Sequence, residues 1–172
     1  MAKKKNVPKV QTPNSRIPNQ DLPRNNVKFS FYYDRWLKSY SSSDFTNYLN
    51  SENMYGKYIT ELFNIIIPKI TKDWSPKTQS SQFLHCHKVG NDRAFRRYSK
   101  AIEAIHQIQT DQLDLWQFGF TGSLRIIAHL SGDNTIYPLL IDYHHLGYDS
   151  IKYNGIDRSH YSFCPIDNYS RH

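Results

Sequence analysis

The sequence predicts an α+β domain, with helices packed on one face of an antiparallel sheet, behind a disordered basic arm. Three observations support this fold class. Apolar residues recur at helical spacing over 54–70 and 92–108. From Leu113 the apolar period changes to two, as in strands. The first residues are too polar to build a core. We therefore expect an arm at 1–27 and a single domain at 28–172.

The arm is defined by composition and charge. Prolines recur every five residues at positions 8, 13, 18 and 23, with Asn, Gln and Ser between them. Through Lys28 there are seven basic residues and one acidic residue, a net charge of +6. The remaining 15 basic and 14 acidic residues leave the rest of the chain at +1. Such an arm binds polyanions without sequence preference. A solubilising tail or a partner-binding peptide explains the same composition.

Composition also bounds the class of protein. A hydrophobic content of 38% and an aromatic content of 15% suffice for a core in a chain of 172 residues. No apolar run is longer than three residues, and Ile65 to Ile67 ends at Pro68, so none can span a membrane. The N-terminal lysines precede no apolar stretch, so we expect no secretory signal. The two cysteines, Cys86 and Cys164, are expected to be free thiols. We expect a cytoplasmic protein without a membrane segment.

Four segments before the sheet carry local signals. The aromatic-rich segment 27–40 is expected to begin as a strand and end in a helical turn. Ser43 or Asp44 can cap a short helix that reaches Leu49. Asn53 can cap the longer helix at 54–70, which Pro68 would kink or shorten. Asn91 or Asp92 can cap the helix at 92–108.

Strands are expected at 83–89, 115–120, 123–130 and 135–143. Glycine-containing and polar turns separate the last three, which therefore form an antiparallel meander. The remaining segment, 148–172, has no clear period, and its end is expected to fray.

Histidines and one arginine are the most informative polar residues of the predicted strands. Alternate residues of a strand share a face, so His85 and His87 point one way and Cys86 the other. On the strand at 123–130, Arg125 and His129 face away from the apolar side that meets the helices. We therefore expect these two side chains on the more polar face.

These residue types suit cleavage of RNA without a metal ion. A base removes the 2′-hydroxyl proton, an acid protonates the leaving 5′-oxygen, and a cation stabilises the phosphoryl intermediate. His87 and His145 can supply the two proton-transfer groups, and Arg125 can supply the cation. Further contacts to the substrate are expected from residues on the same segments and on a basic helix face: His85, Lys88, Arg96, Arg97 and His144. No cofactor is expected.

Simpler explanations remain open for each candidate. A histidine in a strand can be a structural hydrogen-bond partner, and Arg125 can pair with Asp142 across the hairpin. The pair His144 and His145 can form a polar turn. The basic helix face can be an ordinary solvated surface. A zinc site with nitrogen and sulfur ligands is the competing chemistry; its candidate ligands are His85, Cys86, His87, His160 and Cys164.

Several short motifs resemble the RelE/ParE superfamily of small toxins from prokaryotic toxin–antitoxin systems and related phage or mobile-element proteins. They are Gln117-Phe118-Gly119, Arg125-Ile126-Ile127-Ala128, Asp142-Tyr143-His144-His145, and His85-Cys86-His87-Lys88 before the sheet. The resemblance covers about 83–148. It implies a helical hairpin on a twisted antiparallel sheet and mRNA endoribonuclease activity, usually at the ribosome, neutralised by an antitoxin.

Functional roles transfer from that family only to His87, Arg125 and His145, with Lys88 in support. The arm, the segment 29–40 and the helix at 94–108 have no counterpart there. The leading hypothesis is therefore a toxin-like, metal-independent endoribonuclease. The alternative is a non-enzymatic nucleic-acid-binding or topoisomerase-inhibiting module of a toxin–antitoxin or phage system. A structural phage or mobile-element protein is a third hypothesis.

Overall fold

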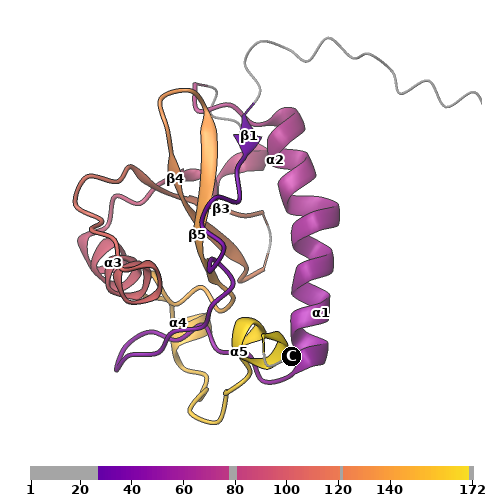
Figure 1. Ribbon diagram of the computed structural model, residues 1–172, viewed down its shortest axis with the longest axis vertical. Coiled ribbons are helices and arrows are strands. Elements are labelled where there is room, and N and C mark those ends of the chain that lie inside the picture. Colours follow the sequence, from indigo (N-terminus) through magenta and orange to yellow (C-terminus); the bar gives the residue numbers. More distant parts are fainter. Residues whose placement is uncertain (1–26, 78–80, 121, 171–172) are drawn as a thin grey trace, which may run out of the picture.

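The computed structural model describes residues 27–77, 81–120 and 122–170 (Figure 1). The predicted arm lies outside these residues except for Val27. That side chain is 1% exposed and belongs to the hydrophobic core. Val27 therefore packs with the folded domain, and the rest of the predicted arm lies outside the described residues.

The centre of the fold is a mixed sheet of five strands in the order β1-β5-β4-β3-β2. The strands are β1 (Lys28–Phe29), β2 (His87–Lys88), β3 (Leu115–Phe118), β4 (Arg125–Leu130) and β5 (Thr135–Asp142). The predicted meander is confirmed, since β3, β4 and β5 pair antiparallel in sequence order. β1 pairs in parallel with β5, so the sheet is not purely antiparallel.

The predicted helix at 54–70 is longer than expected. Its parts are α1 (Glu52–Glu61), a π-helical turn η1 (Leu62–Ile66) and α2 (Ile67–Asp73). Ser51, not Asn53, is the N-cap, because its side chain accepts a hydrogen bond from the Met54 amide. Pro68 does not end the helix. Pro68 lies in the first turn of α2, directly after the π-helical turn η1. That turn is the break in regular α-helical hydrogen bonding that a proline requires on its N-terminal side.

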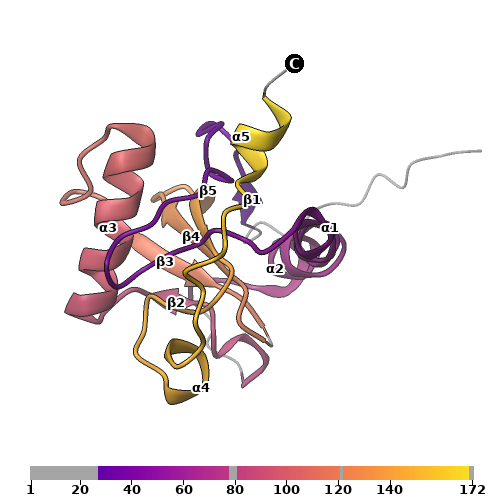
Figure 2. The ribbon, with the colours of Figure 1, turned by 90° about the horizontal axis from the view of Figure 1, so that it is seen from below.

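Helices cover both faces of the sheet, so the expectation of helices on one face is wrong. α3 (Asp92–His106) packs on the face opposite to α1 and α2, as Figure 2 shows. One core cluster joins the α1–α2 side to Ile126 and Ile141, and a second joins α3 to Ile127 and Leu140. Both faces of β4 and β5 are therefore apolar along most of their length.

The short helix expected to reach Leu49 is absent. Phe45, Asn47 and Leu49 are buried at every second position, which is the period of an extended chain. The Asn47 amide bonds to the backbone carbonyl of Ile141, and its carbonyl accepts from the Tyr40 amide. These local side-chain bonds replace the helical ones.

Two other segments differ from the expectation. Only β2 and the 3₁₀ turn η2 (Ser81–Phe83) occur in the strand expected at 83–89. Beyond residue 148 the chain forms α4 (Ile151–Asn154) and α5 (Pro165–Tyr169). α5 lies beside the start of α1 (Figure 1), where Tyr55 contacts the rings of Phe163 and Tyr169.

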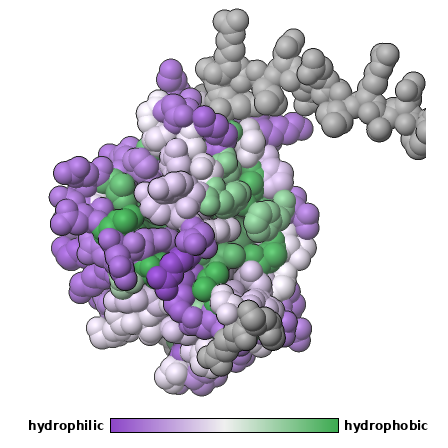
Figure 3. All heavy atoms as spheres, viewed as in Figure 1, coloured by the Kyte–Doolittle hydropathy of each residue, from purple (hydrophilic) through white to green (hydrophobic). Residues whose placement is uncertain are grey.

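Within the described residues, no helix combines the length and apolar character needed to cross a bilayer. In the view of Figure 1, hydrophobic side chains reach the surface beside the long helix, whereas the side that carries α3 is largely hydrophilic (Figure 3). Phe31 and Phe63 are exposed and contact Trp36 beneath them.

Candidate functional site

Several predicted site residues lie at strand ends that meet at the same end of the sheet. β2 begins at His87, which pairs with Gln117 near the end of β3. β4 begins at Arg125, which pairs with Asp142 at the end of β5. Because these pairs are antiparallel, His87, Arg125 and the loop after Asp142 gather at the same end of the sheet.

A tyrosine ring joins the two predicted histidines. The ring centroid of Tyr148 lies 6.1 Å from His87 and 6.0 Å from His145, both edge-on. On its other side His145 stacks on Tyr153, with centroids 5.3 Å apart and planes 6° from parallel. We call His85, His87, Arg125, His145 and Tyr148 the histidine cluster.

His87 has a protein partner at each ring nitrogen. Nε2 lies 3.1 Å from the Gln117 amide nitrogen, and Nδ1 lies 2.9 Å from the Lys88 carbonyl oxygen. This pattern fits the neutral tautomer in which Nδ1–H donates to the carbonyl and Nε2 accepts from the amide. Both proton-transfer positions of His87 are therefore occupied.

His145 is held in an unusual backbone conformation. Its φ is 57°, in the left-handed region that non-glycine residues rarely adopt. Its Nδ1 is buried and has no hydrogen-bond partner. Burial lowers the pKa of His145, and the Arg125 charge lowers it further, more than the Asp142 carboxylate raises it. The resting imidazole is therefore neutral near pH 7.

Asp142 fixes the loop that carries His145. Its carboxylate accepts hydrogen bonds from the amides of His144 and Leu146 at 3.1 Å and from Gly147 at 2.9 Å. It also accepts one from the Tyr98 hydroxyl of α3 at 3.0 Å. The loop is therefore anchored by one fully buried carboxylate that accepts four hydrogen bonds. These bonds hold the backbone on both sides of His145, whose φ is in the left-handed region.

Arg125 does not lie on an exposed polar face, contrary to the expectation. It is 1% exposed because α3 covers that side of the sheet. One guanidinium nitrogen donates to the carbonyls of Gly122 and Leu124, and the buried Nε has no partner. No carboxylate of the described residues lies within ion-pair distance of it, so the alternative of a simple Arg125–Asp142 pair is wrong.

His85 completes the cluster. It is half-buried, and within the described part of the chain its ring nitrogens make no hydrogen bond. Burial lowers the pKa of His85, and the Arg125 charge lowers it further. Cys86 points to the opposite side, into the core formed with α1 and α2, as the strand alternation predicts. Burial raises the pKa of the Cys86 thiol to about 11, so it is not a nucleophile near pH 7.

Two residues expected to bind substrate have structural partners instead. Arg97 is 4% exposed and forms ion pairs with Asp44 and Asp149. Its placement on the outer face of the helix was therefore wrong. His144 is also buried, and its Nε2 lies 2.7 Å from the Tyr48 carbonyl oxygen, away from His145.

The other two basic candidates remain at the surface. Lys88 is exposed and forms an ion pair with Asp114. Arg96 is exposed on α3 and makes no ion pair within the described ranges. The structure therefore does not join Arg96 to the histidine cluster.

The competing zinc hypothesis finds no support in the geometry. Among the described residues, no three histidine, cysteine or acidic side chains converge as ligands for one metal ion. Of the five candidate ligands, His85 and His87 belong to the histidine cluster, and Cys86 points into the core. Cys164 is buried near Ser39, and His160 is exposed beside Tyr161.

Sequence reasoning missed part of the cluster. Tyr148 and Tyr153 come from a segment without hydrophobic period, and nothing in the sequence marks their contact with the imidazoles. Gln117 appeared only within a motif, although its pairing with His87 follows once β2 and β3 are aligned. Asp142 was noted in the Asp-x-x-His motif, but not as the centre of the loop's hydrogen bonds.

Comparison with known proteins gives one clear relationship. A family model described as "Uncharacterised protein UU032" matches residues 30–171, which include the whole histidine cluster. The "Uncharacterized protein UU032" of Ureaplasma parvum serovar 3 (strain ATCC 700970) is 33% identical over 173 residues, covering 97% of each chain. No solved structure matches the chain.

Proposed function

Given that this chain belongs to the UU032 family, we propose that it is a metal-independent endoribonuclease whose proton-transfer pair is His85 and His145. The observation that carries the proposal is that the half-buried His85 and His145 belong to the same cluster as the buried Arg125, which forms no ion pair with a carboxylate of the described residues.

The reaction is an internal transfer at phosphorus. The 2′-oxygen bonds to phosphorus as one imidazole accepts its proton, and the phosphorus–5′-oxygen bond breaks as the other imidazole protonates the leaving oxygen. The products are a 2′,3′-cyclic phosphate and a 5′-hydroxyl. No proton, electron or co-reactant is left over. His85 and His145 are suited to this exchange because the Nε2 of each makes no hydrogen bond within the described residues, whereas the Nδ1 of His145 is buried and takes no part.

In this proposal His87 and Arg125 act indirectly. His87 was expected to transfer a proton, but both of its ring nitrogens make hydrogen bonds within the protein. We propose instead that His87 positions Gln117 and Tyr148. Arg125 is too buried for its guanidinium to clamp a phosphate. It is proposed to place a positive charge near the two imidazoles, where it lowers the pKa of both and favours a phosphate.

The wider proposal is a toxin-like, cytoplasmic enzyme that acts on mRNA, with the ribosome and an antitoxin as partners. Support comes from the RelE/ParE-like motifs that carry His85, Arg125 and His145, and from the basic excess before Lys28. Tyr148 and Tyr153 add aromatic faces of the kind on which unpaired RNA bases stack.

The alternative of a non-enzymatic nucleic-acid-binding module draws on the same basic segment but is weakened on α3. On α3, Arg93 and Arg97 form ion pairs with Asp149, and Lys88 of β2 pairs with Asp114. Their charge is therefore largely compensated. Binding of RNA without any cleavage would favour this alternative.

Product analysis tests the proposal. The full chain is incubated with an end-labelled RNA of mixed sequence, and with the DNA of the same sequence. We expect fragments that end in 2′,3′-cyclic phosphate from RNA and no cleavage of DNA, because DNA lacks the nucleophile. Cleavage of both polymers, or 3′-hydroxyl products, would contradict the mechanism.

A further inference from the structure

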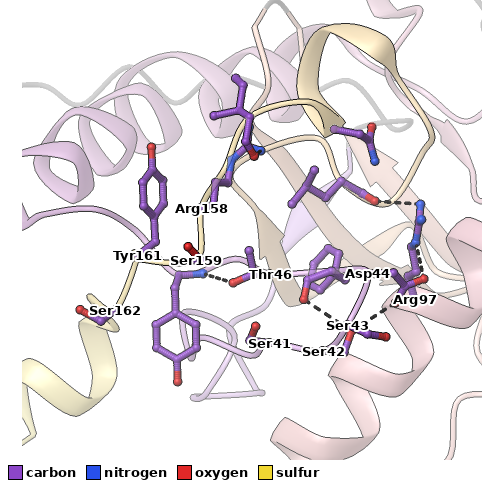
Figure 4. A pocket seen from close by; sticks show the side chains of 15 residues that line it. Ser41, Ser42, Ser43, Asp44, Thr46, Arg97, Arg158, Ser159, Tyr161 and Ser162 are labelled. Carbon is purple, nitrogen blue, oxygen red and sulfur yellow. Dashed lines mark hydrogen bonds and ion pairs between the residues drawn. The ribbon is translucent and has the colours of Figure 1, made fainter.

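A concave site lies next to the histidine cluster. It is a cavity of about 730 Å³ between the loop at 41–46 and the segment at 154–162, which face each other in Figure 4. We call it the serine pocket, because hydroxyl groups of Ser41, Ser43 and Ser162 line it. Its volume falls within the roughly 300–1,000 Å³ of sites that bind small molecules.

The serine pocket and the histidine cluster share two chain segments, one at His145 and Leu146 and one at Tyr153 and Asn154. Leu146 lines the pocket and directly follows His145. Asn154 lines the pocket and directly follows Tyr153, the residue stacked on His145. One turn of α4 therefore presents an aromatic ring to the cluster and a polar side chain to the pocket. A ligand in the pocket is separated from the proposed reaction centre by a single layer of chain.

The charge of the pocket comes from Arg158. Its guanidinium donates to the carbonyls of Tyr153 and Ile156 at 2.8 and 3.0 Å, and no carboxylate of the described residues pairs with it. The other arginine at the pocket, Arg97, is already neutralised by Asp44 and Asp149. An anionic group in the pocket would therefore find an unpaired cation at Arg158.

The remaining lining matches the rest of a nucleotide. The hydroxyls of Ser41, Ser43 and Ser162 make no hydrogen bond within the described ranges, so they are free to bind a sugar hydroxyl or a phosphate oxygen. The rings of Tyr48 and Tyr161 give the pocket aromatic surface for a base. Hydroxyls, an arginine without an ion pair and aromatic rings are contact types that proteins use to bind single-stranded RNA.

We infer that the serine pocket binds one nucleotide of the RNA strand, next to the phosphate that the histidine cluster cleaves. This inference rests on the proposed function for the identity of the polymer. It assigns phosphate binding to Arg158, and contact with the sugar–phosphate backbone to Ser41 and Ser43. The pocket contributes affinity and position, and the proton transfers stay with His85 and His145.

The test separates this inference from the proposed function. Binding is measured by fluorescence anisotropy with a labelled RNA hexamer in which every 2′-hydroxyl is methylated, so that it cannot be cleaved. Cleavage of the unmethylated hexamer is measured in parallel. We expect Arg158→Ala to weaken binding about tenfold, as for the loss of a charged hydrogen bond. KM should rise by a similar factor, and kcat should change little.

Two variants guard against a merely structural effect, because Arg158 also bonds to backbone carbonyls. Ser41→Ala with Ser43→Ala leaves those bonds intact and should weaken binding several-fold. Lys72→Ala removes the same charge from an exposed position on α2 and should change binding little. Equal effects of Arg158→Ala and Lys72→Ala would overturn the inference even if the RNA is cleaved. Selective weakening without any cleavage would support the pocket and overturn the proposed function.

Discussion

Tyr153 lies flat against His145, with the two rings 6° from parallel and their centroids 5.3 Å apart. The imidazole is thus held from one side by a stacked ring and from another by the edge contact with Tyr148. Because its backbone is in the left-handed region, His145 would not keep this position by local preference alone. The geometry of the proposed site therefore depends on residues that take no part in proton transfer.

The stacking itself can be tested at Tyr153. We expect Tyr153→Ala to lower kcat for RNA cleavage on the order of tenfold, because a displaced imidazole reaches the phosphate less often. Tyr153→Phe keeps the ring and should retain most of the activity. Single-turnover rates with both variants check this. Equal losses for Phe and Ala would show that the hydroxyl, not the stacked ring, matters.

The pH dependence of cleavage should reflect two histidines with lowered pKa values. Burial is the largest cause for both His85 and His145, and both values lie below 6.5. One imidazole must be neutral and the other protonated, so kcat/KM should peak between the two values. We expect a maximum below pH 6.5 and a fall of about tenfold per pH unit well above it. A rate that keeps rising from pH 6.5 to 8 would contradict this pair.

Arg125 should control that pH profile without touching the substrate. Replacing it by Met removes the positive charge that lowers the pKa of His85 and of His145. We expect both pKa values to move upward in a histidine NMR titration, and the optimum of kcat/KM to move with them. Circular dichroism checks that the variant is folded. Unchanged histidine titrations in a folded variant would show that Arg125 has only a packing role.

A substitution at Gly147 tests the contact between the loop after Asp142 and Tyr98 of α3. A Cβ atom at this position would lie 1.9 Å from the Tyr98 hydroxyl, so Gly147→Ala must displace either the loop or the ring. We expect a loss of about 1–3 kcal/mol in the free energy of unfolding, as for overpacked sites. Gly132→Ala is the matched control, because nothing lies within 4 Å of its added Cβ. Urea denaturation of both variants checks this, and equal stabilities would count against the packing described.

Folding stability should fall in mild acid. Burial lowers the pKa of four histidines, His85, His106, His144 and His145, below the 6.5 of an unfolded chain. Below pH 6.5 the unfolded chain therefore binds protons first, and the free energy of unfolding decreases as the pH falls. Asp44 and Asp114 do not titrate in this window, because their lowered pKa values lie below 3.8.

Urea midpoints at pH 7.5 and 5.5 measure this effect. His144→Gln should reduce the difference between the two midpoints, since it removes the buried imidazole bonded to Tyr48. His160→Gln, at an exposed position, controls for loss of an imidazole. A midpoint that does not fall at pH 5.5 would contradict the burial of these side chains.

The hydrophobic period allowed prediction of the two long helices and the meander, since each has a face that must be buried. It could not show that α3 covers the second face of the sheet. The alternation along β4 placed Arg125 opposite Leu124 correctly, but the polar character of Arg125 suggested an exposed face where the structure has a buried one. Pattern alone gives the side on which a residue lies and not what covers that side.

The candidate site could be predicted only in part for a related reason. Strand alternation put His87 and Cys86 on opposite sides, and strand pairing brought His87 to the end of the sheet where Arg125 lies. His85 lies in the turn before β2, so the predicted strand does not explain its place. The serine pocket and the stacking on Tyr153 depend instead on irregular segments, where position follows from specific long-range contacts. Asp44 illustrates the problem, since it looked like a helix cap and instead pairs with Arg97 of α3.

The central claim is that His85 and His145 transfer the protons of RNA cleavage. The most direct test is the single-turnover cleavage rate of one RNA by the wild type, His85→Ala, His145→Ala and the control His129→Gln, at pH 6 with EDTA present. Our account predicts cleavage by the wild type and by His129→Gln, and losses of about 10²- to 10⁴-fold for each of the other two variants. Wild-type rates in His85→Ala and His145→Ala, with both variants folded, would contradict it.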